Sequence, residues 1–177
     1  SIVTILALHG GGIEPATTEL AYTIAHCGDY NYFSFKGMRS KGNNELHVTS
    51  THYDDQIALD LVRGSQRTVA IHGCEGNESV AYIGGSDDRL IELITESLED
   101  IGISVREAPH HISGTQENNI VNMTQTQGGV QLELTAQLRK ELFKNRKSSR
   151  KNRENKDNWD DLMYDFADAM KKAIERA

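Results

Sequence analysis

Long apolar runs, cysteines and aromatic residues are all scarce in this sequence of 177 residues. No apolar run approaches the ~20 residues of a membrane-spanning helix, and none resembles the apolar region of a signal peptide. The two cysteines, Cys27 and Cys74, cannot form a disulfide framework, although one bridge between them stays open. Aromatic residues make up only 6%, so we expect a core of Ile, Leu, Val and Ala.

Positive charge is also in the minority. The chain has 19 Lys and Arg against 26 Asp and Glu, which is a formal net charge of −7. This balance argues against general binding to nucleic acid or to an anionic membrane. The length favours one domain, residues 1–177, with one sizeable core. Because a strand-like apolar run begins at residue 1, we expect an upstream segment that has been cut or processed away.

The charge is unevenly distributed along the chain. Residues 1–143 contain 9 basic and 19 acidic residues, whereas residues 144–177 contain 10 and 7. Seven of these basic residues fall within Lys144–Asp157, a run that has no apolar residue. Such a composition cannot help to build a core and is typical of a solvated loop or a disordered insert. We therefore predict a flexible basic loop at about residues 144–157.

Strand-like runs alternate with helical ones, which predicts an α/β domain with a largely parallel or mixed sheet. Strands are expected at residues 2–8, 30–35, 46–50, 68–72, 79–83, 101–105 and 130–134. Helices are expected from Pro15 to about Cys27, at 57–62 behind a cap at Asp54 or Asp55, and at 88–101, 135–143 and 159–174.

Three polar residues fall at or near the carboxyl ends of the expected strands. His9 follows the first strand, His72 ends the strand at 68–72, and Glu14 lies just before the first helix. Ligands bind at this end of an open α/β sheet, and two imidazoles with a carboxylate form the ligand set of a catalytic zinc. A hydrogen-bonded structural histidine is the alternative for His72. A phosphate cradle at Gly10–Gly12 is a weaker alternative, because the P-loop and dinucleotide spacings are missing.

Glu133 is a further candidate for chemistry. Strand alternation places Gln131 and Glu133 on one face of their strand, and Leu132 and Leu134 on the other. A carboxylate that faces inward from a buried strand is costly unless it has a partner or a function. We expect Cys74 to be a small buried thiol rather than a ligand. The remaining histidines, which show no tight ligand spacing, are His26, His47, His52, His110 and His111.

Taken together, five segments closely resemble the phage-related poly-γ-glutamate hydrolase family. They are HGGGIEP at 9–15, THYDD at 51–55, GSQRTVAIHGC at 64–74, YIGG at 82–85 and GGVQLEL at 128–134. The resemblance runs from about Ile2 to Arg139. It implies a compact three-layer α/β/α fold with a mixed, largely parallel central sheet, similar to that of the zinc carboxypeptidases. It also implies a hydrolase of γ-glutamyl amide bonds.

The same resemblance implies one Zn²⁺ per chain, held by His9, Glu14 and His72, with Glu133 as the catalytic carboxylate. The first two ligands are five residues apart here, whereas the broader zinc carboxypeptidases place the corresponding pair three residues apart. The loop must therefore fold back at Gly10–Gly12, which glycines permit. This departure agrees with the poly-γ-glutamate branch and argues against exopeptidase specificity.

The implied substrate is an anionic polymer that carries an α-carboxylate at every residue. Guanidinium groups bind carboxylates in a bidentate manner, so arginines should orient this polymer. The candidates in the matched region are Arg63, Arg67, Arg89 and Arg139. We prefer Arg89 and Arg139, which follow the Gly84–Gly85 turn and the strand of Glu133. An exposed helical charge is the alternative for each.

Two other functions stay open at this stage. One is a zinc amidase that acts on small N-acyl amino acids through a closed pocket. The other is a non-catalytic phage-derived protein that binds polymer or a host partner, with a structural zinc. Structural zinc normally has four protein ligands, so the three evident here favour catalysis. A polymer substrate further implies action outside the cell, and we expect a monomer that requires neither nucleic acid nor membrane.

Overall fold

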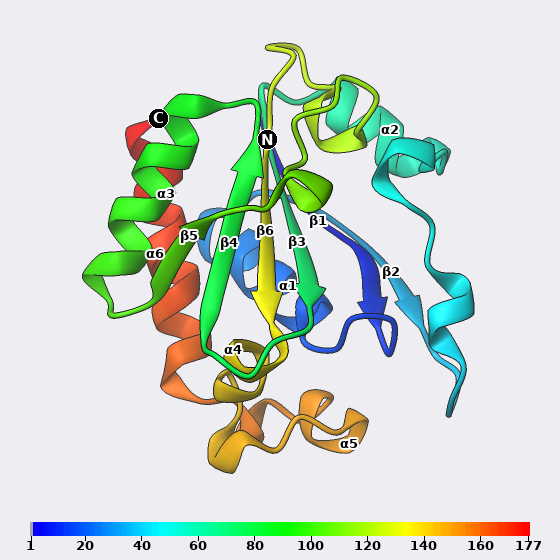
Figure 1. Cartoon of the computed structure of the whole chain (residues 1–177), viewed down its shortest axis with the longest axis vertical. Coiled ribbons are helices and arrows are strands. Elements are labelled where there is room, and N and C mark those ends of the chain that lie inside the picture. Colours follow the sequence, from blue (N-terminus) through cyan, green and yellow to red (C-terminus); the bar gives the residue numbers. More distant parts are fainter. Residues whose placement is uncertain (1) are drawn as a thin grey trace.

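A mixed six-stranded sheet organises the structure, a computed structural model that describes residues 2–177 (Figure 1). Ser1, the first residue of the expected domain, lies outside the described residues. The strand order is β2-β1-β3-β6-β4-β5. The strands are β1 (Val3–Gly11), β2 (Asn31–Gly37), β3 (Arg67–Cys74), β4 (Val80–Gly85), β5 (Ser104–Glu107) and β6 (Val130–Thr135).

Strand direction creates one edge at which several carboxyl ends meet. β1, β2, β3 and β6 run parallel to one another, whereas β4 is antiparallel to β6 and parallel to β5. This confirms the mixed, largely parallel sheet that was expected. The chain passes from β1 to β2 on one side and then to β3 on the other, so the strand order reverses at β1. Ligands of open α/β sheets bind outside the carboxyl ends of the strands at such a reversal.

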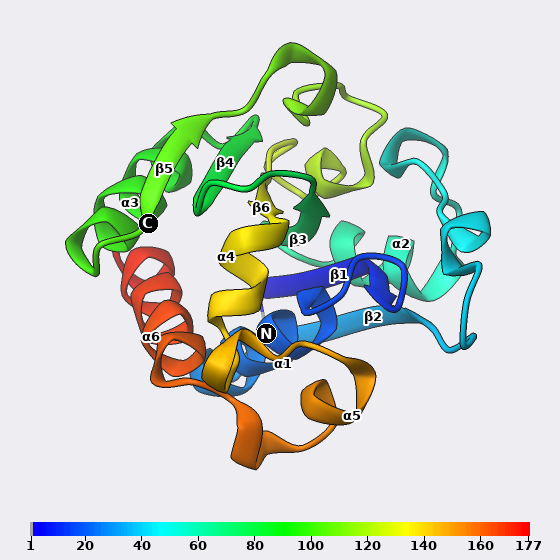
Figure 2. The ribbon, with the colours of Figure 1, turned by 60° about the horizontal axis from the view of Figure 1, so that its bottom comes forward.

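Helices cover both faces of the sheet, as a three-layer fold requires (Figure 2). The helices α1 (Thr17–Gly28), α3 (Asp88–Asp100) and α6 (Asp161–Arg176) pack against Ile71, Leu132 and Leu134 on one face. On the other face, α2 (Gln56–Arg63) and the 3₁₀ turn η4 (Ile120–Asn122) enclose a smaller core. The helix α4 (Ala136–Glu141) follows β6 directly. Within residues 2–177, no helix combines the length and the apolar character that crossing a membrane requires.

Side-chain caps explain why several helices begin where the sequence predicts. Asp55 accepts a hydrogen bond from the Ala58 amide at the start of α2, and Asp87 accepts one from the Leu90 amide at the start of α3. Each bond satisfies an amide that has no partner within the helix. α1 starts differently, because its N-cap is Ala16 in the left-handed region with φ 82° and no capping side chain.

Residues 46–50 do not form the expected strand. They lie across two 3₁₀ turns, η1 (Asn43–Leu46) and η2 (Ser50–His52), and the Val48 carbonyl accepts a hydrogen bond from the side chain of His9. This segment therefore crosses the carboxyl edge of the sheet instead of pairing with a strand. The strand predicted at 101–105 is also displaced, because Gly102 has φ 86° and β5 begins only at Ser104.

The basic run 144–157 is mostly exposed, as expected of a solvated loop, but it contains short helical turns and is not a disordered insert. It forms η5 (Lys144–Arg146), α5 (Arg150–Arg153) and η6 (Lys156–Asn158). Within it, Arg153 is only 7% exposed and lies 3.3 Å from the Glu19 carboxylate of α1. The Trp159 indole N–H donates a hydrogen bond to the Arg153 carbonyl. The run thus packs through a buried ion pair, which a search for apolar residues does not detect.

A β-bulge near the carboxyl end of β1 determines where His9 points. Ala7 pairs with Ser34 of β2, but Gly10 pairs with Lys36, so β1 has one residue more than its partner between these pairs. Strict alternation from Ala7 would turn His9 towards the large core under α1. The extra residue instead turns the His9 ring to the opposite face, where it meets His72.

The substitution Gly10→Ala tests how tightly this bulge is packed. A Cβ at residue 10 would meet the Thr18 hydroxyl and lie 2.8 Å from the Phe35 carbonyl oxygen. Because the backbone cannot move aside easily, we expect the free energy of unfolding in urea to fall by roughly 3 kcal/mol. Gly102→Ala is the control, since its Cβ would meet nothing within 4 Å and only its left-handed backbone costs about 1 kcal/mol. Equal losses in the two variants would contradict the packing argument.

Candidate metal centre

Three side chains from separate elements converge at the carboxyl edge of the sheet. His9 is on β1, Glu14 is in the turn before α1, and His72 is on β3. The His9 Nδ1 atom lies 3.2 Å from Glu14 Oε1 and 3.1 Å from His72 Nδ1, and the latter two atoms are 3.5 Å apart. The structure therefore brings together the three residues that the sequence singled out as possible metal ligands.

The spacing of these three atoms fits a small tetrahedral cation. Zinc binds histidine nitrogen and carboxylate oxygen at ~2.0–2.2 Å, which separates two ligands of a tetrahedron by ~3.3–3.6 Å. The observed separations of 3.1, 3.2 and 3.5 Å lie close to this range. The donor set is thus compact enough to share one ion and leaves a fourth tetrahedral position without a protein ligand.

The tautomer of His9 also suits a metal. Its Nε2 atom lies 2.6 Å from the Val48 carbonyl oxygen, which can only accept a hydrogen bond, so Nε2 carries the proton. The lone pair of Nδ1 then faces Glu14 and His72. A second polar contact of this kind commonly orients a metal-binding histidine. His72 is likewise buried, and its Nε2 atom has no hydrogen-bond partner while its Nδ1 faces the cluster.

Glu14 is held in its ionised form. Burial by itself would raise the pKa of Glu14, but the adjacent His72 and His9 imidazoles outweigh this effect and hold the pKa well below the usual range. The Gly73 amide also donates a hydrogen bond to Oε1 over 3.1 Å. For His72, burial lowers the pKa, but the Glu133 and Glu14 carboxylates raise it above its ordinary value. A metal ligand must be deprotonated, and Glu14 already meets this condition.

Glu133 lies beside this cluster but makes no ion pair within 4.0 Å. It is the register partner of His72 in the β3–β6 ladder, and only 8% of it is exposed. Burial raises the pKa of Glu133 to about 7, against the opposing effect of His72. The alternation predicted for β6 is confirmed, since Leu132 and Leu134 face the large core. A carboxyl with a pKa near neutrality can both accept and donate a proton under physiological conditions.

Two amides that the sequence did not connect hold Glu133 in place. The Gln131 side-chain amide donates to the Ile112 carbonyl over 2.9 Å and lies 3.5 Å from Glu133 Oε1. The Asn119 amide in turn donates to Gln131 Oε1 over 3.2 Å. The loop that precedes β6 therefore fixes the orientation of the residues on the polar face of β6.

The cluster and Glu133 line a cavity of about 400 Å³. Two loops supply the rest of its wall, mostly hydroxyls, amides and imidazoles. These residues are His47, Thr49, Ser50, Thr51, His110, His111, Ile112, Ser113, Gly114, Gln116, Asn119 and Gln131. His47, which the sequence left unassigned, stacks on His9 with 3.8 Å between ring centroids. Its sequence spacing from the three candidate ligands gave no signal, because the stacking on His9 depends on how residues 46–50 cross the carboxyl edge of the sheet.

None of the four predicted arginines contributes to the wall of this cavity. Arg89 is exposed and pairs with Glu92 on α3, and Arg63 is exposed at the end of α2. Arg67 begins β3, at the end of the strand remote from His72. The expectation that these side chains orient the polymer stays a prediction, and any contact with it would lie outside this cavity.

Arg139 has a different place from the other three. Its guanidinium donates to the carbonyl oxygens of Leu134, Pro15 and Cys74 over 2.9–3.1 Å. These carbonyls belong to the end of β6, to the turn that carries Glu14 and to the end of β3. Arg139 therefore ties together the three segments that carry the site, and each of its three guanidinium nitrogens donates one hydrogen bond within the protein.

The cysteines take no part in the candidate metal centre. Cys27 and Cys74 are both free, so the bridge that the sequence left open is not formed. Cys74 is half-buried, less than the buried thiol that was expected, and burial raises the pKa of its thiol to about 11. A thiol that stays protonated at neutral pH is a poor metal ligand.

Comparison with known proteins gives one consistent result. A model of the family described as poly-gamma-glutamate hydrolase matches residues 1–169. The SPbeta prophage-derived UPF0714 protein YoqZ of Bacillus subtilis strain 168 is 39% identical over 143 residues, which cover 80% of this chain and 52% of YoqZ. The chain also covers 57% of the UPF0714 protein YndL of that strain. It thus spans little more than half the length of these two curated relatives.

Two solved structures share the fold. A bacteriophage poly-gamma-glutamate hydrolase superposes with a TM-score of 0.94 at 32% identity, over 98% of this chain and 83% of that chain. A zinc-free apo structure of YndL superposes with a TM-score of 0.91 at 31% identity, over 99% of this chain and 85% of that chain. Nearly the whole of this chain therefore has the same fold as both structures.

The buried carboxyl of Glu133 predicts a pH-dependent stability in protein stripped of metal. Its pKa is about 7 in the folded chain against 4.5 as the ordinary value, so its contribution to stability is full below pH 4.5 and falls as the pH rises through 7. Glu133→Gln removes this loss. We therefore expect the free energy of unfolding of the variant, relative to that of the wild type, to increase from pH 5 to pH 8. The increase should be at most about 3 kcal/mol.

Urea unfolding of the chelated proteins at several pH values measures this gain. Glu75→Gln is the matched control, because it removes the same kind of carboxylate from an exposed position in the loop after β3. A difference between Glu133→Gln and the wild type that stays constant from pH 5 to pH 8 would show that Glu133 does not titrate as described.

Proposed function

This chain belongs to the poly-γ-glutamate hydrolase family, and from that membership we propose that it is a zinc-dependent hydrolase of the γ-glutamyl amide bonds in poly-γ-glutamate. The convergence of His9, Glu14 and His72 beside the buried Glu133 carries the proposal. The likeness to a phage hydrolase of this polymer supports the substrate, and the likeness to a YndL structure described as zinc-free supports the metal. Because the substrate is a polymer, we also propose that the protein acts outside the cell.

The residues of the site divide the chemistry between them. His9, Glu14 and His72 would hold one zinc ion, which when bound supplies a Lewis acid and lowers the pKa of water towards ~7. Glu133 would accept a proton from the attacking water and deliver it to the leaving amine. Its pKa of about 7 suits both transfers. Gln131 and Asn119 keep the Glu133 carboxyl in position, and Arg139 keeps the three ligand segments together.

The cavity wall favours a polymer over a small amide. His47, Thr49, His110 and His111 are exposed at its rim, so the cavity opens to solvent along two loops instead of closing over a single residue. A long chain can therefore enter and leave on either side of the reacting bond. The burial of Glu133 beside the ligand cluster argues against the non-catalytic alternative, because a buried carboxylate without an ion-pair partner is costly unless it has a function.

Loss of one ligand should abolish zinc binding. We expect His72→Ala to retain no stoichiometric zinc after dialysis, because the two remaining ligands cannot fill a tetrahedral site. His52→Ala is the control, since His52 is exposed and does not line the cavity, and it should keep one zinc per chain. Metal analysis of the purified proteins measures both. Full zinc content in His72→Ala would refute the ligand assignment.

Loss of the proposed proton acceptor should abolish turnover but not zinc binding. We expect Glu133→Gln to keep its fold and its metal and to cleave poly-γ-glutamate roughly 10²–10⁴-fold more slowly, because the amide preserves the shape but cannot take a proton. Glu75→Gln should keep wild-type turnover. The rate of shortening of the polymer measures the effect, and a Glu133→Gln variant with more than a tenth of wild-type activity would exclude this role.

A further inference from the structure

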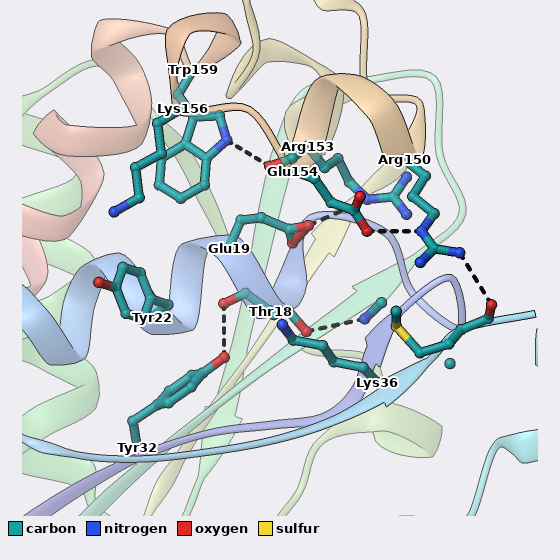
Figure 3. Close-up of a pocket in the computed structure, with 13 residues that line it drawn as sticks. Thr18, Glu19, Tyr22, Tyr32, Lys36, Arg150, Arg153, Glu154, Lys156 and Trp159 are labelled. Carbon is teal, nitrogen blue, oxygen red and sulfur yellow. Dashed lines mark hydrogen bonds and ion pairs between the residues drawn. The ribbon is translucent and has the colours of Figure 1, made fainter.

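A second cavity lies on the α1 side of the sheet (Figure 3). Its volume is about 300 Å³. α1 and β2 form one wall, and the segment 150–159 forms the other. We call it the basic pocket and define it by Tyr22, Lys36, Arg150, Arg153, Lys156 and Trp159. The charged and aromatic side chains shown in Figure 3 come from parts of the chain more than 100 residues apart, which only the folded basic run brings together.

Positive charge exceeds negative charge in this pocket. Four cations line it against two carboxylates, and the carboxylates are already paired. Arg153 pairs with Glu19 over 3.3 Å, and Arg150 pairs with Glu154 over 2.8 Å. Lys36 and Lys156 form no ion pair within 4.0 Å with any residue of 2–177. Two ammonium groups are therefore available to an anion from outside.

Aromatic rings stand beside one of these ammonium groups. The Lys156 Nζ atom lies 4.9 Å from the centroid of the Tyr22 ring and 5.7 Å from that of the Trp159 ring. Such contacts hold the ammonium near the rings without neutralising its charge. The rings also offer apolar surface for the methylene groups of an anionic ligand. The pocket therefore suits a carboxylate that is attached to a short aliphatic chain.

Only a narrow ridge of backbone separates the basic pocket from the candidate metal centre. Gly11 lines the basic pocket, and it follows His9 by two residues, a span of at most ~7 Å along the chain. The ridge is tied to β2 by a hydrogen bond from the Gly12 amide to the Gly37 carbonyl over 2.9 Å. A polymer that crosses the carboxyl edge of the sheet at Gly12 can therefore contact both places.

The cavity at the metal centre lacks the cations that an anionic substrate would bind, and the basic pocket contains them. No Lys or Arg stands among the described residues of that cavity, and residues 1–143 contain 19 acidic residues against 9 basic ones. An anionic polymer is thus repelled by most of the surface. We propose that the basic pocket binds side-chain carboxylates of a polyglutamate stretch that extends from the bond at the metal centre. This inference rests on the proposed function and adds a second contact with the same substrate.

Removal of the two unpaired ammonium groups tests the proposal in the zinc-loaded enzyme. Lys36→Gln/Lys156→Gln should raise KM for long poly-γ-glutamate roughly three- to tenfold at low salt, because each lost exposed contact weakens binding by a small factor. The value of kcat should stay unchanged, and so should KM for a γ-glutamyl dipeptide, which has no residue beyond the two that flank the reacting bond. High salt should remove the difference from the wild type.

Lys171→Gln/Lys172→Gln is the control for total charge, because it removes two positive charges from α6, where each lysine pairs with a carboxylate of the same helix. We expect this variant to keep the wild-type KM for the long polymer. A rise in KM equal to that of the pocket variant would show that total surface charge is responsible, and would overturn the proposal. An unchanged KM in the pocket variant would overturn it as well.

Trp159 is the only tryptophan of the sequence, so its fluorescence reports on the basic pocket without turnover. In the Glu133→Gln background, long poly-γ-glutamate should change the Trp159 emission in a saturable way, with a midpoint three- to tenfold higher when Lys36 and Lys156 are replaced. Unchanged emission would overturn the inference. If the wild-type enzyme fails to cleave the polymer, the proposed function fails, but a saturable change in emission still supports the pocket as a polyglutamate site.

Discussion

The rest of the site depends on one irregularity of the backbone, the bulge at the carboxyl end of β1. Regular alternation would point His9 into the large apolar core, where an imidazole could meet neither His72 nor Glu14. The extra residue reverses the direction of the His9 ring, and the glycines that follow return the chain so sharply that Glu14 reaches the same point only five residues later. Close packing around Gly10 makes this geometry rigid, because no side chain fits there.

Polar groups buried at this edge are nearly all satisfied by a neighbouring element, and that is why they can be buried. Glu14 accepts a hydrogen bond from the Gly73 amide, and each of the three guanidinium nitrogens of Arg139 donates one hydrogen bond to a backbone carbonyl. Glu133 differs, because it is held by an amide and has no cation within ion-pair distance. Burial raises the pKa of Glu133, and the opposing effect of His72 does not cancel it. Hydrogen-bonded residues thus surround the Glu133 carboxyl, which remains able to exchange a proton.

The basic segment shows how charged residues can build structure. Arg153 packs over α1 through its contact with Glu19, and its carbonyl holds the indole of Trp159. This packing places the segment near β2 (Figure 2). Arg150 and Lys156 of the segment therefore line the same pocket as Lys36. The two cavities then lie on either side of the same glycine-rich turn. One contains the acid–base and ligand groups, and the other contains the cations that the first one lacks.

Local patterns in the sequence determined much of this protein. The Asp55 and Asp87 caps define where α2 and α3 begin, and the alternation in β6 separates Glu133 from the core leucines, because caps and periodicity act between residues a few positions apart. Strand ends also identified His9, Glu14 and His72 as a set. Tertiary structure alone decided the direction of the His9 ring and its hydrogen bond to Val48, which is 39 residues away. It alone also decided the hydrogen bond from Arg139 to the Pro15 carbonyl, which is 124 residues away. Each of these depends on the register or position of a distant segment, which no local pattern records.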